Sequence, residues 1–234
     1  MSGLEQWQDA ISQNLANTDV AGYKAVGVSM HTQKMSTGNT DDFAASLGSE
    51  LVKANTTVDN RTGSLVQSGG KMDCAIDGEG YFQVRTTDGS TKYTRDGHFH
   101  VNNQNQIVNA SGEALMGTSG VISVAQGGGE VSVDSTGHIY QGTALVGQMA
   151  IVNASNPGSL VPAGGGFVSD TSSDPGMQQV GPPRVLQGYS ETSNVSALRE
   201  MVNMILVSRA YEANEKVIGS ADSSMGKATS AFSV

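Results

Sequence analysis

The 234-residue chain has few of the features on which several protein classes depend. A single cysteine, Cys74, excludes an internal disulfide; it lies in the apolar run 72–76 and is expected to be a small buried side chain. Lys and Arg total 13 against 22 Asp and Glu, and this net charge of −9 argues against nucleic acid or an anionic membrane as a partner. No apolar run approaches the ~18 residues of a membrane span, so direct membrane insertion is not expected. The first residues lack a basic region followed by an apolar one, so we expect no cleavable secretory signal.

Aromatic residues make up only 5% of the chain, whereas glycine reaches 30 residues. A core built from such a sequence must rest on Val, Ile, Leu and Met in short strands separated by turns. The length suffices for one good core or a core with appendages.

The two ends of the chain carry the pattern of amphipathic helices. Residues 3–17 place Leu4, Trp7, Ile11 and Leu15 on one helix face, and turn residues predict an end near Asn17. Residues 193–228 predict a longer helix of about 35 residues, or ~50 Å, capped by Ser193 or Asn194. Its apolar stripe comprises Leu198, Met201, Val202, Ile205, Ala210, Tyr211, Val217, Ile218, Ala221, Met225 and Ala228.

The middle of the chain has the pattern of strands and tight turns. The dipeptides Asp77-Gly78, Asp88-Gly89 and Asp96-Gly97 predict hairpin turns, because glycine accepts a positive φ at little cost. Strands are expected at 81–86, 91–95, 98–101, 131–133, 139–140 and 145–152, with a last strand near 184–189.

The sequence thus predicts an α+β fold in four parts. These are an N-terminal helix (1–24), an extended connector (25–70), a β-rich, hairpin or barrel-like outer domain (71–188) and a C-terminal helix (189–234). The connector is rich in Ser, Thr, Asn and Gly, and Leu47, Leu51 and Val52 indicate a possible short helix within it.

A search for chemistry returns no catalytic motif. His98 and His100 have no third ligand at a metal-site spacing, and the Asp-Gly pairs lack the run of alternating acids of a calcium loop. The triple glycines at 127–129 and 164–166 lack the Lys-Ser/Thr of a phosphate loop. We therefore predict no enzyme activity, no cofactor and no metal site.

Three groups of motifs, in order along the chain, resemble those of the bacterial flagellar hook and basal-body rod proteins. The first is Asn14-Leu15-Ala16-Asn17 followed by Gly22-Tyr23-Lys24. The second is the run 77–84, followed by Tyr93-Thr94-Arg95-Asp96-Gly97-His98-Phe99. The third is the run 188–195, which includes Ser193, Asn194 and Val195, followed by the runs 200–205 and 209–214, the last from Arg209 to Asn214.

The resemblance implies that both termini pair as an axial, coiled-coil-like inner layer and that the β-rich domain lies outside it. It implies self-association and contacts with other axial proteins of the rod and hook. It further implies export through the flagellar type III apparatus and a place in the periplasmic rod, as a proximal or distal subunit. The expected assembly interface consists of the helix faces Leu4, Trp7, Ile11, Leu15, Leu198, Met201, Val202, Ile205, Tyr211, Val217 and Ile218.

One departure from the family pattern and two other functions are weighed against this reading. Family members usually have roughly two more helical turns before the position of Gly3, at ~3.6 residues each, so we expect either the start site or the inner helix contacts to depart from the family pattern. A β-rich surface adhesin with a helical stalk predicts a secretory signal and a ligand. A small β-fold hydrolase predicts convergent acidic or nucleophilic residues in a pocket.

Overall fold

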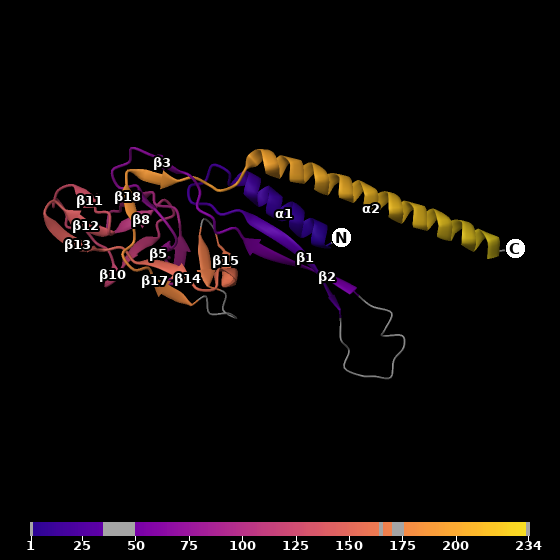
Figure 1. The fold of residues 1–234 in the computed structure, drawn as a ribbon, viewed down its shortest axis with the longest axis horizontal. Helices are drawn as coiled ribbons and strands as arrows, with labels where there is room; N and C mark the ends of the chain where they lie inside the picture. Colours follow the sequence, from indigo (N-terminus) through magenta and orange to yellow (C-terminus); the bar gives the residue numbers. More distant parts are fainter. Residues whose placement is uncertain (1, 35–49, 164–165, 170–175, 233–234) are drawn as a thin grey trace, which may run out of the picture. The chain divides into compact units, whose positions relative to one another are not determined.

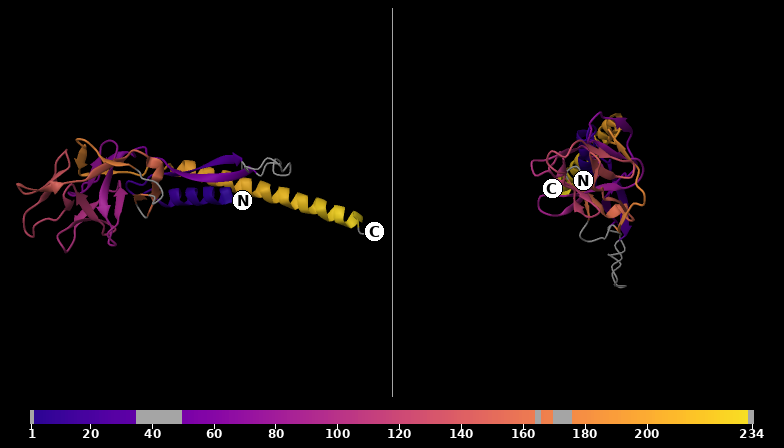
Figure 2. Two further views of the ribbon diagram at one scale, coloured as in Figure 1. Left: turned by 90° about the horizontal axis from the view of Figure 1, so that it is seen from below. Right: turned by 90° about the vertical axis from the view of Figure 1, so that its left-hand side faces the viewer.

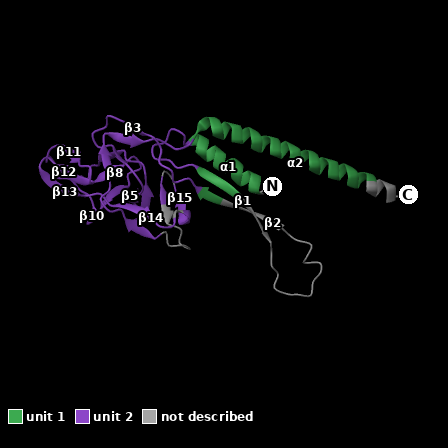
Figure 3. Cartoon of the chain, in the orientation of Figure 1, with its two compact units in different colours: residues 1–16, 26–57, 196–234 green, residues 17–25, 58–195 purple. Residues whose placement is uncertain are grey.

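The computed structural model describes residues 2–34, 50–163, 166–169 and 176–232. The fold is α+β, with a β-rich body and a long C-terminal helix (Figure 1). The chain divides into two compact units (Figure 3). Unit 1 comprises Met1–Ala16, Val26–Thr57 and Ser196–Val234, and unit 2 comprises Asn17–Ala25 and Val58–Val195.

Unit 1 contains the elements α1 (Ser2–Ala16), β1 (Val26–Lys34), β2 (Glu50–Val58) and α2 (Ala197–Phe232). Helix α1 contacts both β1 and α2, and it runs beside the first part of α2 (Figures 1 and 2). The apolar side chains that are buried in unit 1 are Ala10, Ile11, Val26 and Val207. Helix α1 ends at Ala16, one residue before the predicted end at Asn17.

Helix α2 spans 36 residues, about 54 Å at ~1.5 Å per residue. It begins at Ala197, and the Glu200 backbone N–H donates to the Ser196 carbonyl at 3.0 Å. Ser196 therefore holds the N-cap position, and the prediction of Ser193 or Asn194 as the cap is wrong. Gly219 and Gly226 both lie inside the helix, where each costs about 1 kcal/mol relative to alanine.

Unit 2 is built on one large sheet. Its main strand order is β15-β16-β6-β5-β9-β8-β7, with β14 paired to β5, β17 paired to β14, and β10 paired to β9. The strands are β5 (Tyr81–Arg85), β6 (Thr91–Thr94), β7 (Phe99–Val101), β8 (Ile107–Asn109), β9 (Ala114–Gly117), β10 (Gly120–Val121), β14 (Ile151–Ala154), β15 (Leu160–Pro162), β16 (Phe167–Ser169) and β17 (Met177–Gln179).

Three smaller sheets complete unit 2. They are the three-stranded β11-β12-β13 and the pairs β18-β4 and β19-β3. Their strands are β3 (Leu65–Gln67), β4 (Cys74–Ile76), β11 (Val131–Val133), β12 (His138–Gln141), β13 (Ala144–Gln148), β18 (Val185–Gln187) and β19 (Tyr189–Glu191), and a short 3-10 turn, η1 (Pro157–Ser159), precedes β15.

The core of unit 2 consists mainly of aliphatic side chains, as the composition predicts. Phe82 and Val84 in β5 are fully buried on one face, and Phe82 meets Phe99 edge to face with ring centroids 5.3 Å apart. Cys74 is buried in β4, as predicted, and burial raises the pKa of its thiol to about 12. The cluster also includes Ile76, Ile107, Leu115, Ile122, Val124, Ile139, Met149, Ile151 and Val185.

The predicted connector contains regular structure. Strands β1 and β2 pair in a two-stranded sheet within unit 1. The possible short helix at Leu51 and Val52 is wrong, because both residues lie in β2, while Leu47 lies outside the described residues. The β-prone Val and Thr residues of this segment form strands, and β1 packs on α1.

Two predicted strands are each divided in the structure. The predicted strand 145–152 is two strands, β13 and β14, because the chain leaves one sheet and enters another at Met149 and Ala150. The predicted strand 184–189 is β18 and β19, separated by Gly188 at φ +77°. Each of these strands pairs with a different partner, which a one-dimensional pattern cannot show.

Only one of the three Asp-Gly dipeptides forms the predicted hairpin. Gly89, at φ 89°, lies in the turn between the paired strands β5 and β6, as predicted. Gly78 also has a positive φ, 128°, but it joins β4 to β5, which do not pair with each other, so the hairpin prediction at Asp77-Gly78 is wrong. Gly97 does not have a positive φ, so Asp96-Gly97 is not the predicted turn. A Cβ on Gly97 would lie 1.6 Å from the Cys74 carbonyl oxygen, and the Cys74 N–H donates to the Gly97 carbonyl at 3.0 Å. Glycine is needed there for the close approach of two backbones.

Candidate functional site: the outer face of the C-terminal helix and a buried charge cluster

Helix α2 has an inner face that is covered within unit 1. Glu200 and Val207 are buried, and Asn203, Met204, Ala210 and Tyr211 are half-buried between and beyond them. Partial burial and the nearby charges of Glu5 and Asp9 in α1 raise the pKa of Tyr211. This spacing of three and four residues is one helix face, and it lies against α1.

The opposite face of α2 is apolar and open. Leu198 is 75% exposed, Met201 and Val202 are each 50% exposed, Ile205 is 55% exposed, and Leu206, at 50%, adds a residue that the sequence analysis did not select. We call Leu198, Met201, Val202, Ile205 and Leu206 the outer face of α2. An apolar face of this kind on a single chain indicates a surface that is covered by another molecule.

Over residues 212–227 the helix is uncovered on every side. Residues 212–227 are all exposed, including Val217 at 67%, Ile218 at 48% and Met225 at 69%. Family motif residue Asn214 lies in this part, and Arg209 is exposed just before it. An isolated helix of this length would be marginal in water, so packing against a partner is the usual source of its stability.

Helix α1 contributes less exposed surface than predicted. Leu4, Trp7 and Leu15 are half-buried, whereas Ile11 is only 1% exposed. Ile11 lies in the contact within unit 1, so it cannot serve as an intermolecular contact while that unit is folded. The predicted apolar face of α1 exists, but Ile11 at its centre is covered by other parts of the same chain.

The motif residue Asn14 has a structural role. Its side chain donates from Nδ2 to the Val26 carbonyl at 2.9 Å and accepts at Oδ1 from the Val26 N–H at 2.8 Å. Asn14 is 2% exposed. Both backbone groups of Val26 are thereby satisfied, which fixes the start of β1 against α1.

The family motif residues from three distant parts of the chain meet in unit 2. Glu191 accepts at Oε1 from Lys24 Nζ at 2.5 Å and at Oε2 from Arg95 Nη1 at 3.0 Å. All three side chains are at most 3% exposed. We call Lys24, Arg95 and Glu191 the Glu191 cluster. Burial lowers the pKa of Lys24, and the hydrogen bond to Glu191 opposes this shift.

Further motif residues surround the Glu191 cluster. Gly22 has φ +67°, and a Cβ there would lie 2.4 Å from the Arg95 backbone carbon. The Gly22 N–H donates to the Glu191 carbonyl at 2.8 Å. Asn194 Oδ1 accepts from the Ala25 N–H at 2.7 Å. The motif positions Gly22, Lys24, Arg95 and Asn194 are therefore explained by one local structure.

The remaining motif residues have smaller local roles. Thr94 Oγ1 accepts from the Asp96 N–H at 3.0 Å, and Ser193 Oγ accepts from the Val195 N–H at 3.2 Å. Ala16 ends α1, and Asn17 accepts from the Val20 N–H in the turn that follows. The Tyr23 carbonyl accepts from the Asn194 N–H at 3.3 Å.

Two central residues were not predicted as site residues. Glu191 lies inside a recognised motif. It could have been found as an acidic residue at the end of a strand, next to Ser190, which is buried. Val207 also carried a signal, because it lies three and four residues from Met204 and Asn203 on the face opposite Ile205. The predicted stripe combined residues of the outer face with Ala210 and Tyr211 of the inner face and omitted Val207. The prediction of Tyr211 on the same open face as Ile205 is therefore wrong, because Tyr211 lies on the face that packs on α1.

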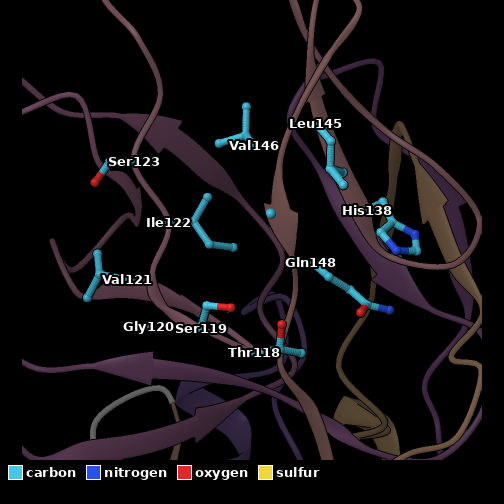
Figure 4. Close-up of a pocket in the computed structure, with 12 residues that line it drawn as sticks. Thr118, Ser119, Gly120, Val121, Ile122, Ser123, His138, Leu145, Val146 and Gln148 are labelled. Atoms are coloured by element: carbon cyan, nitrogen blue, oxygen red, sulfur yellow. The ribbon is translucent and has the colours of Figure 1, made fainter.

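One recess in unit 2 was considered as a ligand site (Figure 4). It measures ≈ 450 Å³ and lies between the hairpin 117–123 and strand β13. Its lining includes no acidic residue, and His138 Nδ1 lies 2.7 Å from Thr136 Oγ1 in the turn before β12. The hydrolase alternative predicts convergent acidic or nucleophilic residues. The recess lacks the acidic residues, and Thr118, Ser119 and Ser123 are the hydroxyl side chains in its lining.

Among residues 2–34, 50–163, 166–169 and 176–232, no group of three or more His, Cys, Asp or Glu side chains could hold a metal ion. Across the same part of the chain, neither helix is long and apolar enough to cross a membrane.

Comparisons with known proteins agree with the motifs. The family model for the flagellar hook protein FlgE/F/G D1 domain matches residues 75–141, and that for the flagellar basal body rod FlgEFG protein C-terminal region matches residues 186–231. The flagellar basal-body rod protein FlgG of Agrobacterium fabrum is 32% identical, over 92% of this chain and 89% of the relative.

Two further relatives extend the same result. FlgG of Buchnera aphidicola subsp. Acyrthosiphon pisum is 32% identical over 97% of this chain and 95% of its own length. The flagellar basal-body rod protein FlgF of Mesorhizobium japonicum is 30% identical over 89% and 84%. The chain therefore belongs to the family of flagellar basal-body rod proteins.

Proposed function

We propose that this chain is a structural subunit of the bacterial flagellar basal-body rod, and that it polymerises into a helical tube that carries motor torque to the hook. Family membership supports the rod, and the observation that carries the assembly mechanism is the outer face of α2. The outer face consists of five large apolar side chains that are at least half exposed. Covering them with a neighbouring subunit is favourable, at roughly 25 cal/mol per Å² of apolar surface removed from water.

The assembly surface is formed by unit 1. In a tube of identical subunits related by a rotation that does not close, each copy presents one surface to a different surface of the next copy. The outer face and the uncovered residues 212–227 supply the apolar part of that contact. The polar residues along α2, such as Ser208, Arg209 and Glu212, find partners on neighbouring subunits. The terminal helices thus become the coiled-coil-like axial layer.

Torque transmission needs a layer that resists shear. Interdigitated side chains at native packing density have low compressibility, and they transmit strain directly. Unit 2 then supplies a separate folded body with its own core. The partners are therefore other copies of this chain and the adjoining axial proteins of the rod and hook.

The route to this location follows from the same helices. We propose export through the flagellar type III apparatus to the periplasmic part of the rod. A helix that gains most of its stability from neighbours can pass through a narrow channel without stable structure and fold at the growing end.

Deletion and complementation test the proposal. A strain that lacks the gene should produce basal bodies whose rod is incomplete by electron microscopy, and it should not swim. A tagged wild-type chain should restore both, and it should be present in purified basal bodies. Complete rods in the deletion strain, or absence of the chain from purified basal bodies, would contradict the function.

A further inference from the structure

The chain crosses from one unit to the other four times, and we call each point where the unit changes between two consecutive residues a passage. Every passage lies next to a hydrogen-bonded residue of unit 2. The passages lie at 16/17, 25/26, 57/58 and 195/196. Within unit 2, the segments that lead to them are 17–25, the stretch from Val58 to Ser64, and 191–195. These three segments are far apart in the sequence, but they are joined to each other by Glu191 and Asn194.

Glu191 joins all three segments and the sheet. Its carboxylate accepts from Lys24 Nζ and from the Gly63 N–H, the latter at 2.9 Å, and its backbone carbonyl accepts from the Gly22 N–H. Arg95, at the end of β6, attaches the same carboxylate to the core, because its Nη2 donates to the Gly78 carbonyl at 2.7 Å and its Nη1 to Glu191. One buried carboxylate therefore carries three charge-assisted or backbone hydrogen bonds.

Asn194 makes the second set of links. Its Oδ1 accepts from the Ala25 N–H, and its Nδ2 donates to the carbonyls of Asp59 and Arg61 at 2.8 and 2.9 Å. The Asp59 N–H donates to the Ala25 carbonyl at 2.8 Å. Hydrogen bonds therefore join Ala25, Asp59 and Asn194 in one place. Each of these residues lies within two positions of a passage between the units.

We propose that Glu191 and Asn194 form a clamp that makes the four passages carry torque as one connection. The inference rests on the proposed function, because torque is the load. Force applied to unit 1 passes into unit 2 through these covalent passages and their supports. Without the clamp the segments would lengthen one after another, and with it their hydrogen bonds are loaded together. Glu191 and Asn194 are positioning residues, because their hydrogen bonds hold chain segments in place.

Another buried ion pair of unit 2 provides a matched control. Lys92 Nζ lies 2.7 Å from Glu113 Oε1, and both side chains are at most 10% exposed. Glu113 also accepts from Asn109 Nδ2 at 2.7 Å. None of these residues lies in a segment that leads to a passage, so Glu113→Gln removes an equivalent buried charge without touching the clamp.

The test is residue-resolved hydrogen exchange on the purified full-length chain. In Glu191→Gln and in Asn194→Ala, the amides of Gly22, Ala25, Asp59 and Gly63 should exchange at least about tenfold faster than in the wild type. The amides of β5 and β9 should keep their rates. In Glu113→Gln the four clamp amides should be unchanged. Asn194→Ala decides the matter if Glu191→Gln does not fold.

Two results would overturn the clamp. One is wild-type exchange at the four amides in the folded variants, and the other is equal acceleration throughout unit 2, as expected if the residues merely stabilise the core. In cells, clamp variants should enter basal bodies normally but lose swimming as medium viscosity rises, whereas Glu113→Gln cells should keep it. Wild-type swimming at every viscosity would refute the mechanical role. Absence of the wild-type chain from basal bodies would count against the proposed function and not against the exchange result.

Discussion

Ile205 and Val207 lie two residues apart in α2 and on opposite faces of the helix. Ile205 is 55% exposed in the outer face, whereas Val207 is 1% exposed in the contact within unit 1. The helix therefore has one apolar face that is already covered and one that is open. This separation allows folding and assembly to be disturbed independently.

We expect Ile205→Asp to leave the isolated chain folded and to block its entry into the rod. A carboxylate at this position is solvated in the free chain, but it would be desolvated between packed subunits, at a cost of several kcal/mol in each subunit. Val207→Asp should instead destabilise unit 1 of the free chain by about 3–5 kcal/mol.

Circular dichroism with thermal unfolding measures the folding of the free chain, and subunit occupancy in purified basal bodies measures its entry into the rod. Asn103→Asp, at an exposed position of unit 2, should pass both tests. Rods that contain Ile205→Asp at wild-type occupancy, in swimming cells, would show that the outer face is not the assembly surface.

Replacement of Asn14 should detach β1 from α1. Asn14→Ala leaves both the N–H and the carbonyl of Val26 without these partners, in a place where Val26 itself is 6% exposed. We expect a loss of ~1–3 kcal/mol in the stability of unit 1. Urea unfolding followed by far-UV circular dichroism provides the measurement. Gln6→Ala, at an exposed position of the same helix, is the control and should change little.

The packing of Gly97 predicts a severe effect from a single methyl group. Gly97→Ala places a Cβ 1.6 Å from the Cys74 carbonyl oxygen, so β4 must separate from the 97–98 segment. A loss of more than ~4 kcal/mol is expected, because the obstacle is backbone and cannot rotate away. Gly181→Ala has no atom within 4 Å of the new Cβ and should be tolerated. Similar melting temperatures for the two variants would contradict this account.

The parts of the fold that were predicted correctly depend on local patterns. The helix near the N-terminus, the long C-terminal helix and the strands at β5, β6 and β11 follow from side-chain periodicity and turn residues. Burial of Cys74 follows from the apolar run around it. Each of these features is decided within a few residues of the chain.

The parts that were missed depend on contacts between distant residues. Ile11 has the pattern of an interface residue, and only the position of β1 and α2 shows that it is covered. Gly97 has the pattern of a turn, and only its approach to Cys74 shows otherwise. Glu191 is an acid in a motif, and its partners lie 96 and 167 residues away. No local pattern contains these partners.

The turn between β5 and β6 should contribute to acid stability. Hydrogen bonds from the Thr86 hydroxyl, and then from the Ser90 N–H and hydroxyl, lower the pKa of Asp88 to about 2 from the usual 3.8. A lowered pKa means that the ionised carboxylate favours the folded state. Its contribution is therefore complete above pH 3.8 and is lost as the pH falls toward 2.

An NMR titration of the Asp88 side-chain carboxyl carbon measures this pKa directly. Asp88→Asn keeps an acceptor oxygen but cannot titrate, so its stability should vary less between pH 4 and pH 2 than that of the wild type. A midpoint near the usual value of an exposed aspartate would show that the turn does not hold the carboxylate.

Cys74 should be chemically silent in the folded chain and reactive once the chain unfolds. The thiolate is the reactive form, and burial, with a smaller effect of Asp73, raises the pKa of this thiol to about 12. At pH 8 only about one thiol in ten thousand would be ionised, and its 1% exposure excludes the reagent as well. We expect no measurable labelling by Ellman's reagent in native buffer and complete labelling of one thiol per chain in urea.

Because Cys74 lies in β4, against Gly97 and the core of unit 2, its labelling rate at intermediate urea reports the opening of that unit alone. Ile205→Asp should leave this rate unchanged and Gly97→Ala should raise it strongly. Rapid labelling of the native wild type would show that β4 is not closed over the thiol.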